Sequence, residues 1–527
     1  MATENTLKKV GLASAIMMSS VFLSRVIGVF REMTIAGVGG IKADVDAYQI
    51  AFVIPEILNH IVASGFLSIT FIPIFTLYLI NKQDQEGYKV FSIIMNTFGL
   101  VLAGLILAGM IWAPRIVSLF APGLHDPATF NLAVKMTRII IPAQFFFFAG
   151  GLLMAVQFAK ERFFIPALAP LIYNLLIILG GVLLGPYMGM EGFAWGVLAG
   201  AFLGNFVLQI FGARQLGIRY FLIISFVHPD LIKYVKLTFP LMLGLTMTFS
   251  MEILLKFFGS YLDPGSIASM NYAIRIMFIL VGLFGQAVGV ASYPFMAKLA
   301  QNKDRTQLNR LLNKTLKYMF LVIPVSVLFM ILSHEMVTIL FQRGRFDAAA
   351  TAVTAGILPF FMIGAFAFSA QNIVSRGYYA IQNTLFPVMF TTICVLASLP
   401  IIGLLMKMMG AKGVALGLSV TVAIQCFVLF ECWNRQSRNT EKNQVYLFFV
   451  KMIPLSLCIG LVLKLSADFL RTILNQGNFG NSLGIVLIIG LEFCLLLFYS
   501  GKIFKIEEIL VFKDKLLAMR RSRNTKI

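Results

Sequence analysis

This sequence is short of charged residues. Only 13% of its 527 residues are Asp, Glu, Lys or Arg, whereas soluble proteins carry about 25%. Hydrophobic residues make up 59%, and the mean hydropathy is +0.87. Apolar stretches of roughly 20 residues recur from end to end, each long enough to cross a bilayer. They are continuously apolar, without the alternation of a β-barrel. The sequence therefore predicts an all-α polytopic membrane protein.

Cysteine and histidine are scarce, and neither is spaced as in a metal site. The five cysteines form no Cys-x-x-Cys pair, which favours buried free thiols. The four histidines show no HExxH or other ligand spacing. The sequence has no P-loop, no Gly-rich nucleotide loop and no nucleophile elbow. We therefore predict a protein that is not an enzyme and has no cofactor and no metal. Its energy must come from an ion gradient, the membrane potential or the substrate's own gradient.

The apolar stretches give fourteen candidate membrane spans. They lie near 10–31, 46–80, 88–112, 131–157, 166–186, 191–213, 235–260, 266–297, 315–334, 351–375, 386–407, 412–433, 446–467 and 482–503. The second and eighth are too long for one straight crossing, so we expect them to tilt, bend (at Pro55 in the second) or extend beyond the bilayer. The first contains Arg25 and lacks a clean cleavage site, which indicates a retained helix and not a signal peptide.

The formal net charge of +20 reflects mainly topology. Lys and Arg concentrate in alternate loops and in the tail at 506–527. By the positive-inside rule, both termini are cytoplasmic, and we expect a bacterial inner-membrane location. The tail can attract anionic membrane lipids. This distribution disfavours nucleic acid as a partner.

The chain also repeats itself at a constant offset of 221 in the numbering. Leu119-Phe120-x-x-Gly123-x-x-Asp126 recurs as Leu340-Phe341-x-x-Gly344-x-x-Asp347, and Gly192-x-Ala194-x-Gly196 recurs as Gly413-x-Ala415-x-Gly417. An offset of six spans keeps the orientation, which makes a parallel repeat. We therefore predict two pseudo-symmetric six-helix lobes, 1–220 and 221–440, followed by two helices in 441–505 and the basic tail.

Arginines inside apolar stretches are the main functional signal. Arg25 and Arg31 lie in or at the edge of the first span, and Arg275 lies about nine residues into the eighth. An arginine in hydrocarbon costs about 2.5–3.5 kcal/mol, so it faces a wet cavity or a partner. Its planar fork matches phosphate oxygens. The pattern predicts a cavity for an anionic ligand; the alternative is that Arg25 and Arg31 reach outward to the headgroups.

Other polar residues cluster in the second and seventh spans. Glu56, Asn59 and His60 share one helix face near the midplane, where they could contact substrate, gate the path or form an internal Glu56–His60 pair. Glu252 and Lys256 are one turn apart, which favours a structural ion pair. The predicted substrate-binding residues are Arg25, Arg31, Arg275, Ser24, Asn59 and His60, and the gating or ion-coupling candidates are Glu32, Asp46, Glu56, Glu252 and Lys256.

Several strings resemble the signatures of MurJ-type (MviN-type) lipid II flippases, in the multidrug/oligosaccharidyl-lipid/polysaccharide exporter superfamily. They are Ser24-Arg25-Val26-Ile27-Gly28-Val29-Phe30-Arg31-Glu32, Asp46-Ala47-Tyr48-x-x-Ala51-Phe52-x-x-Pro55, Phe71-Ile72-Pro73-Ile74-Phe75, Ala121-Pro122-Gly123 and Tyr272-Ala273-x-Arg275. The resemblance implies two lobes that rock between inward- and outward-open states. It also implies a substrate of undecaprenyl-pyrophosphate-linked peptidoglycan precursor, with essential cavity arginines at Arg25, Arg31 and Arg275.

The second span departs from the family pattern. An Arg-Arg pair and a Glu-Gly usually stand where this chain has Asn59-His60 and Ser64-Gly65. Glu56 replaces an asparagine, and Phe278 replaces an acidic residue. The main hypothesis is a lipid II flippase, with membrane lipids and cell-wall synthesis enzymes as further partners. The alternatives are a flippase for another polyprenyl-linked oligosaccharide, a cation-coupled drug exporter, which the arginines disfavour, and a non-transporting scaffold.

Overall fold

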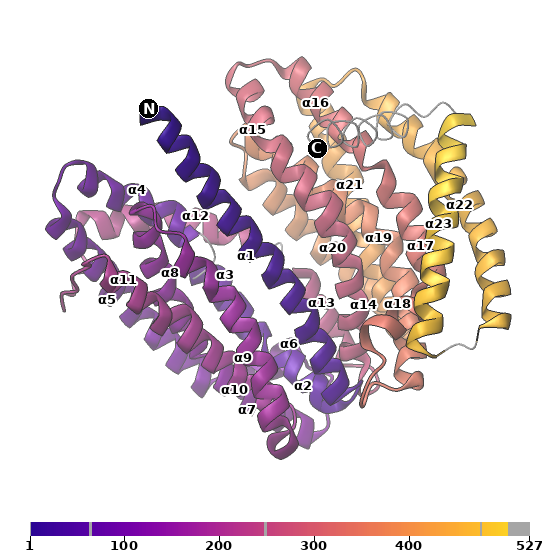
Figure 1. Ribbon diagram of the computed structural model, residues 1–527, viewed down its shortest axis with the longest axis horizontal. Helices are drawn as coiled ribbons and strands as arrows, with labels where there is room; N and C mark the ends of the chain where they lie inside the picture. The colour runs from indigo at the N-terminus through magenta and orange to yellow at the C-terminus, as the bar shows by residue number, and fades with distance from the viewer. Residues whose placement is uncertain (1, 63–65, 247–249, 475–476, 504–527) are drawn as a thin grey trace, which may run out of the picture. The chain divides into compact units, whose positions relative to one another are not determined.

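The computed structural model of the chain describes residues 2–62, 66–246, 250–474 and 477–503 (Figure 1). Within these ranges the structure is helical, and the β pairing is limited to an isolated bridge between Arg343 and Phe346. The described residues divide into two compact units, one made of residues within 2–268 together with Arg343–Asp347, the other made of Ser269–Gln342 and residues within 348–503. The lobes predicted from the repeat, 1–220 and 221–440, stay a prediction. The basic tail at 506–527 lies outside the described residues.

The first unit contains the helices α1 to α13. They are α1 (Ala2–Gly39), α2 (Ala43–Ala51), α3 (Val53–Val62), α4 (Phe66–Ile80), α5 (Asp84–Ile111), α6 (Ala113–Phe120), α7 (Pro127–Ile140), α8 (Ala143–Ala159), α9 (Phe164–Met188), α10 (Glu191–Gly200), the π-helix η1 (Ala201–Val207), α11 (Leu208–Gln215), α12 (Pro229–Thr246) and α13 (Ser250–Gly259). Aromatic side chains from α4, α5 and α8 fill its core, among them Phe71, Phe75, Phe91 and Phe148.

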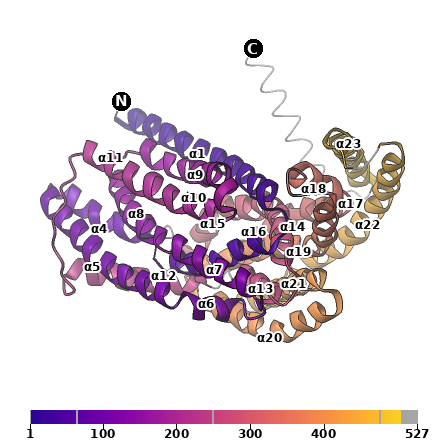
Figure 2. The same ribbon diagram turned by 90° about the horizontal axis from the view of Figure 1, so that it is seen from below.

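The second unit contains the remaining helices. They are α14 (Ser266–Val281), whose first turn belongs to the first unit, the π-helix η3 (Gly282–Gln286), α15 (Ala287–Gln301), α16 (Arg305–Tyr318), the 3₁₀ turn η4 (Met319–Leu321), α17 (Val322–Ile331), α18 (Ser333–Phe341), α19 (Ala348–Ala380), α20 (Leu385–Met409), α21 (Ala411–Ser437), α22 (Lys442–Ile473) and α23 (Phe479–Ile503). Helices α22 and α23 lie side by side in both views (Figures 1 and 2).

Eleven helices in the described ranges are long and apolar enough to cross a membrane. This confirms the prediction of a polytopic helical membrane protein, whereas the count of fourteen spans stays a prediction. The predicted span at 46–80 is interrupted at Phe52, between α2 and α3, close to the bend expected at Pro55. Residues 63–65, between α3 and α4, lie outside the described part of the chain. The break at Phe52 has a local cause. Pro55 lacks the N–H that would bond the carbonyl of Ala51 four residues earlier.

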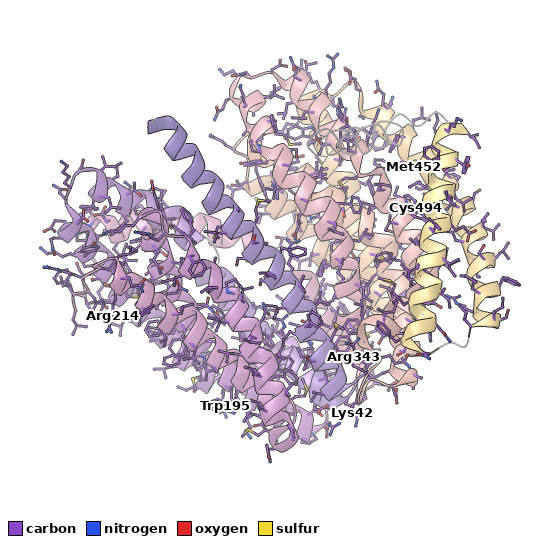
Figure 3. All side chains as sticks on the ribbon, viewed as in Figure 1. Lys42, Trp195, Arg214, Arg343, Met452 and Cys494 are labelled. Atoms are coloured by element: carbon purple, nitrogen blue, oxygen red, sulfur yellow. The ribbon has the colours of Figure 1, made fainter. Side chains whose placement is uncertain are left out.

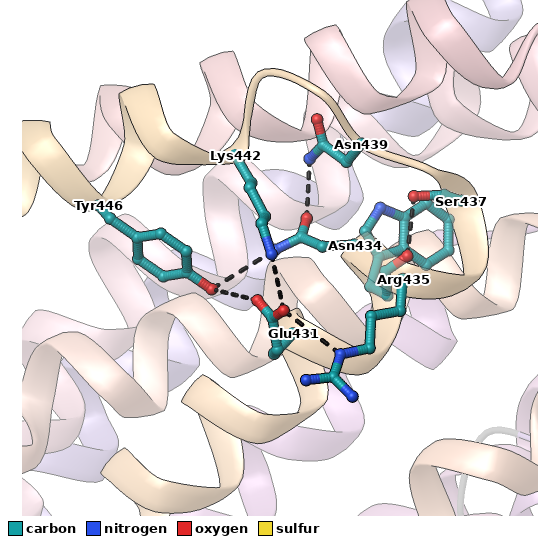
Figure 4. A network of polar contacts seen from close by, with 8 residues as sticks. Glu431, Asn434, Arg435, Ser437, Asn439, Lys442 and Tyr446 are labelled. Atoms are coloured by element: carbon teal, nitrogen blue, oxygen red, sulfur yellow. Dashed lines mark hydrogen bonds and ion pairs between the residues drawn. The ribbon is translucent and has the colours of Figure 1, made fainter.

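Small residues bring helices of the second unit close together. A Cβ on Gly364 of α19 would lie 2.7 Å from Ser419 Oγ of α21, and that hydroxyl donates to the carbonyl of Phe360 at 2.8 Å. Such contacts are typical of helix packing in membranes. At the ends of the helices, the Glu431 carboxylate accepts from Lys442 at 2.7 Å and Tyr446 at 3.0 Å, which fixes α21 to α22 (Figure 4).

Two helices and the turns that follow them match at the offset of the sequence repeat. Helix α9 runs from Phe164 to Met188, and α20 runs between the corresponding positions, Leu385 and Met409. Gly189, after α9, has φ 59° and ψ −133°, and Gly410, after α20, has φ 58° and ψ −133°. L-residues rarely adopt this conformation, which explains glycine at both positions.

The loop Arg343–Asp347 docks on the end of α1, within the first unit. The Arg345 amide donates to the Gly37 carbonyl at 2.8 Å. Gly344 has φ +56°, and a Cβ there would overlap that carbonyl oxygen, so only glycine fits. Figure 3 labels Arg343 and Lys42 beside this end of α1. Gly123 donates its amide to Ser260 Oγ at 3.0 Å, a similar contact after α13. The repeated Gly123 and Gly344 are therefore both close-contact positions.

Candidate functional site

Arg31 lies at the centre of a polar cluster between α1 and α9. Its Nη2 is 2.7 Å from Glu32 Oε1, and its Nη1 donates to Asn174 Oδ1 at 3.0 Å. The Arg31 side chain is 24% exposed, whereas that of Glu32 is 11% exposed. The charge is thus held by one carboxylate and one neutral amide. A guanidinium has five N–H groups. The described residues make these two hydrogen bonds with that of Arg31.

Asn174 joins Arg31 to the rest of the cluster. Its Nδ2 lies 3.2 Å from Ser24 Oγ and 2.9 Å from the carbonyl of Pro170. Ser20 Oγ of α1 also donates to the carbonyl of Ala167 in α9. Ser20, Ser24 and Arg31 are four and seven residues apart and therefore share the face of α1 that packs on α9.

Arg25 does not share that face. It follows Ser24 directly, so its side chain points about 100° away around α1, and it is exposed. The structure therefore brings Arg31 together with Ser24 and Glu32 but places Arg25 on another side of the helix. Sequence reasoning missed Asn174. The available signal was a single amide within the apolar stretch at 166–186, since polar side chains in membrane helices hydrogen-bond across helices.

Glu56 and Lys256 form an ion pair between α3 and α13. Lys256 Nζ lies 3.0 Å from Glu56 Oε2, and the Lys256 side chain is 2% exposed. The sequence predicted Glu252, one turn earlier, as the partner of Lys256, whereas the structure records Glu56, which comes from a distant helix. A buried ammonium requires a nearby anion, and the fold supplies one that local spacing cannot reveal. Glu252 is half-buried on α13. The side chains of Asn59 and His60 lie outside the described part of the structure.

Asp46 anchors the helix that carries Arg275. Its Oδ2 accepts from the Gly265 amide at 2.6 Å, and its Oδ1 accepts from the Ala268 amide at 2.7 Å. A carboxylate there satisfies N–H groups at the start of α14 and matches the positive end of the helix dipole. Gly265 has φ +91°, and a Cβ there would overlap the Ile41 carbonyl oxygen. This geometry gives Asp46 a capping role; its part in gating or ion coupling stays a prediction.

Arg275 belongs to the second unit and is half-buried on α14. Its Nε donates to Asn271 Oδ1, one turn earlier, at 3.3 Å. Two turns later the α-helix changes to the π-helix η3, which continues into α15. π-Helical segments interrupt the regular ladder and are frequent at functional sites. Arg275 thus stands on a helix that is capped by Asp46 at one end and irregular beyond its middle.

Comparisons with known proteins agree over most of the chain. Residues 35–479 match the family described as "Lipid II flippase MurJ", a range that begins after Arg25 and Arg31. The "Probable lipid II flippase MurJ" of Buchnera aphidicola subsp. Baizongia pistaciae is 28% identical, over 78% of this chain and 80% of the relative. The "Lipid II flippase MurJ" of Burkholderia cenocepacia is 27% identical, over 83% of this chain and 86% of the relative.

Solved structures show the same fold. A structure of "Lipid II flippase MurJ, inward closed conformation" aligns with a TM-score of 0.75 at 25% identity, and the alignment covers 93% of this chain and 99% of that one. An inward-facing multidrug resistance MATE family transporter of the MOP superfamily aligns with a TM-score of 0.65 at 14% identity, over 81% of this chain and 95% of that one. The second likeness is one of fold alone. The family match spans more than half of the sequence, and this multi-pass membrane protein belongs to the lipid II flippase MurJ family.

Proposed function

We propose that this chain moves lipid II, the undecaprenyl-pyrophosphate-linked peptidoglycan precursor, from the inner to the outer leaflet of a bacterial cytoplasmic membrane. The observation that carries the proposal is the Arg31 guanidinium on α1, in the first span predicted from the sequence. Described residues bind two of its N–H groups. A pyrophosphate supplies the oxygens that such a fork binds bidentately. We assign Arg25, Arg31 and Arg275 as its ligands. Family membership supports the choice of lipid II over other anions.

Two lobes that alternate between inward- and outward-open states would carry the substrate across. The proposal of a parallel repeat is supported by the matching ends of α9 and α20 and by the shared conformation of Gly189 and Gly410. Both termini would be cytoplasmic, as the distribution of Lys and Arg favours. Membrane potential or an ion gradient would supply the energy, and cell-wall synthesis enzymes would act before and after transport.

A second cargo is favoured by one observation. Asn59 and His60 stand where family members usually have two arginines, so the second span brings less positive charge to the substrate. A different polyprenyl-linked oligosaccharide would keep the pyrophosphate but change the glycan. In that case the arginine ligands stay the same, and the glycan alone distinguishes the two cargoes.

Replacement of Arg275 tests the proposal. In cells depleted of their own flippase and rescued by this chain, we expect Arg275→Ala to abolish growth and to leave lipid II in the inner leaflet. The loss of charge-assisted bonds of about 1.5–3 kcal/mol each is large enough for this. Protein abundance in the membrane should stay normal. The measurement is the accessibility of lipid II from outside the cell.

Arg310→Ala is a matched control, because Arg310 is an exposed arginine of the same unit in an ion pair with Glu441. It should leave transport unchanged. Wild-type growth with Arg275→Ala would refute the assignment of Arg275. The second cargo would be supported if the chain rescued the growth of cells that lack a flippase for another glycan but did not restore lipid II transport.

A further inference from the structure

Arg376 is a half-buried arginine near the end of α19, outside the residues considered so far. Its guanidinium lies against Gly289 of α15: a Cβ at Gly289 would be 2.9 Å from Arg376 Nε and 3.4 Å from Cζ. Any larger residue would push the guanidinium away. The glycine therefore makes a shallow notch in α15 in which the arginine rests, one turn before the end of α19 at Ala380.

The surroundings of Arg376 differ from those of three other arginines in its unit. Arg310, Arg435 and Arg471 each have a carboxylate within ion-pair distance. Across the described residues, no ion pair and no hydrogen bond is found for the Arg376 guanidinium. The titratable groups close enough to act on it are the phenols of Tyr293 on α15 and Tyr379 on α19. A phenol O–H can donate to the same anion that the guanidinium binds.

The position along the helices suits a lipid phosphate. Arg376 lies one turn before the end of α19, about 6 Å along the helix axis from Ala380. Helix α15 continues past this level to Gln301 and carries Lys298, and α16 begins with Arg305. This is the end of the helices where the positive-inside rule predicts the cytoplasmic surface. A phosphate at the inner headgroup level would therefore meet a guanidinium, two phenols and a basic surrounding.

We propose that Arg376, resting on Gly289, binds the phosphate of a membrane lipid where the first turn of α15 packs against the last turn of α19, near Tyr293 and Tyr379. Because the guanidinium has no carboxylate partner among the described residues, its N–H groups can bind an oxyanion. The aromatic rings of Tyr293 and Tyr379 can contact the glycerol or prenyl part of the lipid. The phosphate could come from a bilayer phospholipid or from the diphosphate of a prenyl-linked substrate that enters from the inner leaflet. The second source rests on the proposed function, whereas the first does not.

Native mass spectrometry of the purified full chain in detergent tests the site with three probes: short-chain phosphatidylglycerol, farnesyl diphosphate and short-chain diacylglycerol. We expect Arg376→Gln to weaken binding of at least one phosphate probe about tenfold or more, without any effect on diacylglycerol. Arg376→Lys should fall between, because it keeps the charge but loses the fork. Gly289→Val should weaken binding similarly, because it displaces the guanidinium without removing its charge.

Arg310→Gln is the matched control for the removal of one positive charge. Unchanged phosphate binding in both Arg376→Gln and Gly289→Val would overturn the proposal, and so would an equal loss in Arg310→Gln. A loss confined to farnesyl diphosphate supports a substrate site, and a loss that includes phosphatidylglycerol supports a phospholipid site. If Arg376→Gln fails to fold, as judged by its melting temperature, Gly289→Val decides. Failure of lipid II transport by the wild-type chain would leave the phosphatidylglycerol result standing.

Discussion

Arg31 and Arg471 are both arginines in apolar helices, and both have a buried carboxylate partner, yet their guanidinium groups are used differently. Arg471 of α22 donates from Nε and Nη2 to the two oxygens of Glu335 at 2.9 and 2.8 Å. It also donates to Asp468 at 2.9 Å and to the Ile331 carbonyl at 2.8 Å. Arg31 makes two bonds within the described structure, one of them to a neutral amide.

The difference separates a structural arginine from one that can serve a ligand. Arg471 engages all three guanidinium nitrogens and joins α22 to α17 and α18. Its carboxylate partner Glu335 is 1% exposed, so the pair acts as a clamp that leaves little for an incoming anion. Arg31 is held in position by Asn174 and neutralised by Glu32, but it retains N–H groups for a phosphate. The number of N–H groups that the protein already binds, and not depth alone, therefore distinguishes the two roles.

The largest expected effect on stability belongs to the clamp. Arg471→Ala would leave the buried Glu335 carboxylate without its fork, which costs about 3–5 kcal/mol. We expect a marked fall in the melting temperature in detergent and a loss of membrane-inserted protein. The double variant Glu335→Leu with Arg471→Met removes both charges and should recover much of the stability. A melting temperature of Arg471→Ala close to that of the wild type would break the comparison.

The same conservative change should separate the two sites by function. Arg31→Lys keeps a cation beside Glu32 but loses the fork, so we expect near-normal stability and lipid II transport reduced about tenfold or more. Arg471→Lys should show the opposite, with reduced stability and transport that follows the amount of folded protein. The measurements are melting temperature and leaflet accessibility of lipid II per folded molecule. Normal transport by Arg31→Lys would indicate that a point charge suffices at Arg31.

Much of the fold could be predicted from the sequence, because long apolar runs and positive loops are local signals. The short helices α6 and α18 were not predicted as helices, since eight or nine residues fall below the length of a membrane span. The repeated string that includes Leu119-Phe120 and Leu340-Phe341 marked both places, but only as a repeat. Likewise, Pro55 signalled the bend in the second span, but not that the break between α2 and α3 falls three residues earlier, at Phe52.

The site was predicted in its charges but not in its partners. Arg31 stood out because an arginine in an apolar stretch is costly, and Glu32 stands beside it. Asn174 and the Glu56–Lys256 pair were missed, because these contacts join residues 143 and 200 positions apart. Spacing within one helix reports on neighbours one turn away. It therefore suggested Glu252 for Lys256, whereas the recorded partner comes from another helix.

Asn174 offers the smallest and most specific test of the comparison. Asn174→Leu removes the acceptor for Arg31 and the donor to Ser24, each worth about 1 kcal/mol. The guanidinium would keep Glu32 but lose the contact that orients it, so we expect transport to fall severalfold with a small loss of stability. Asn174→Asp places a second carboxylate within reach of Arg31 and should reduce transport more, because it fills the donors that a phosphate needs. Ser24→Ala removes only the outer contact of Asn174 and should reduce transport less than either change at Asn174. If Asn174→Asp transported as well as the wild type, Arg31 would not act as a phosphate ligand. Its role would then be structural, like that of Arg471.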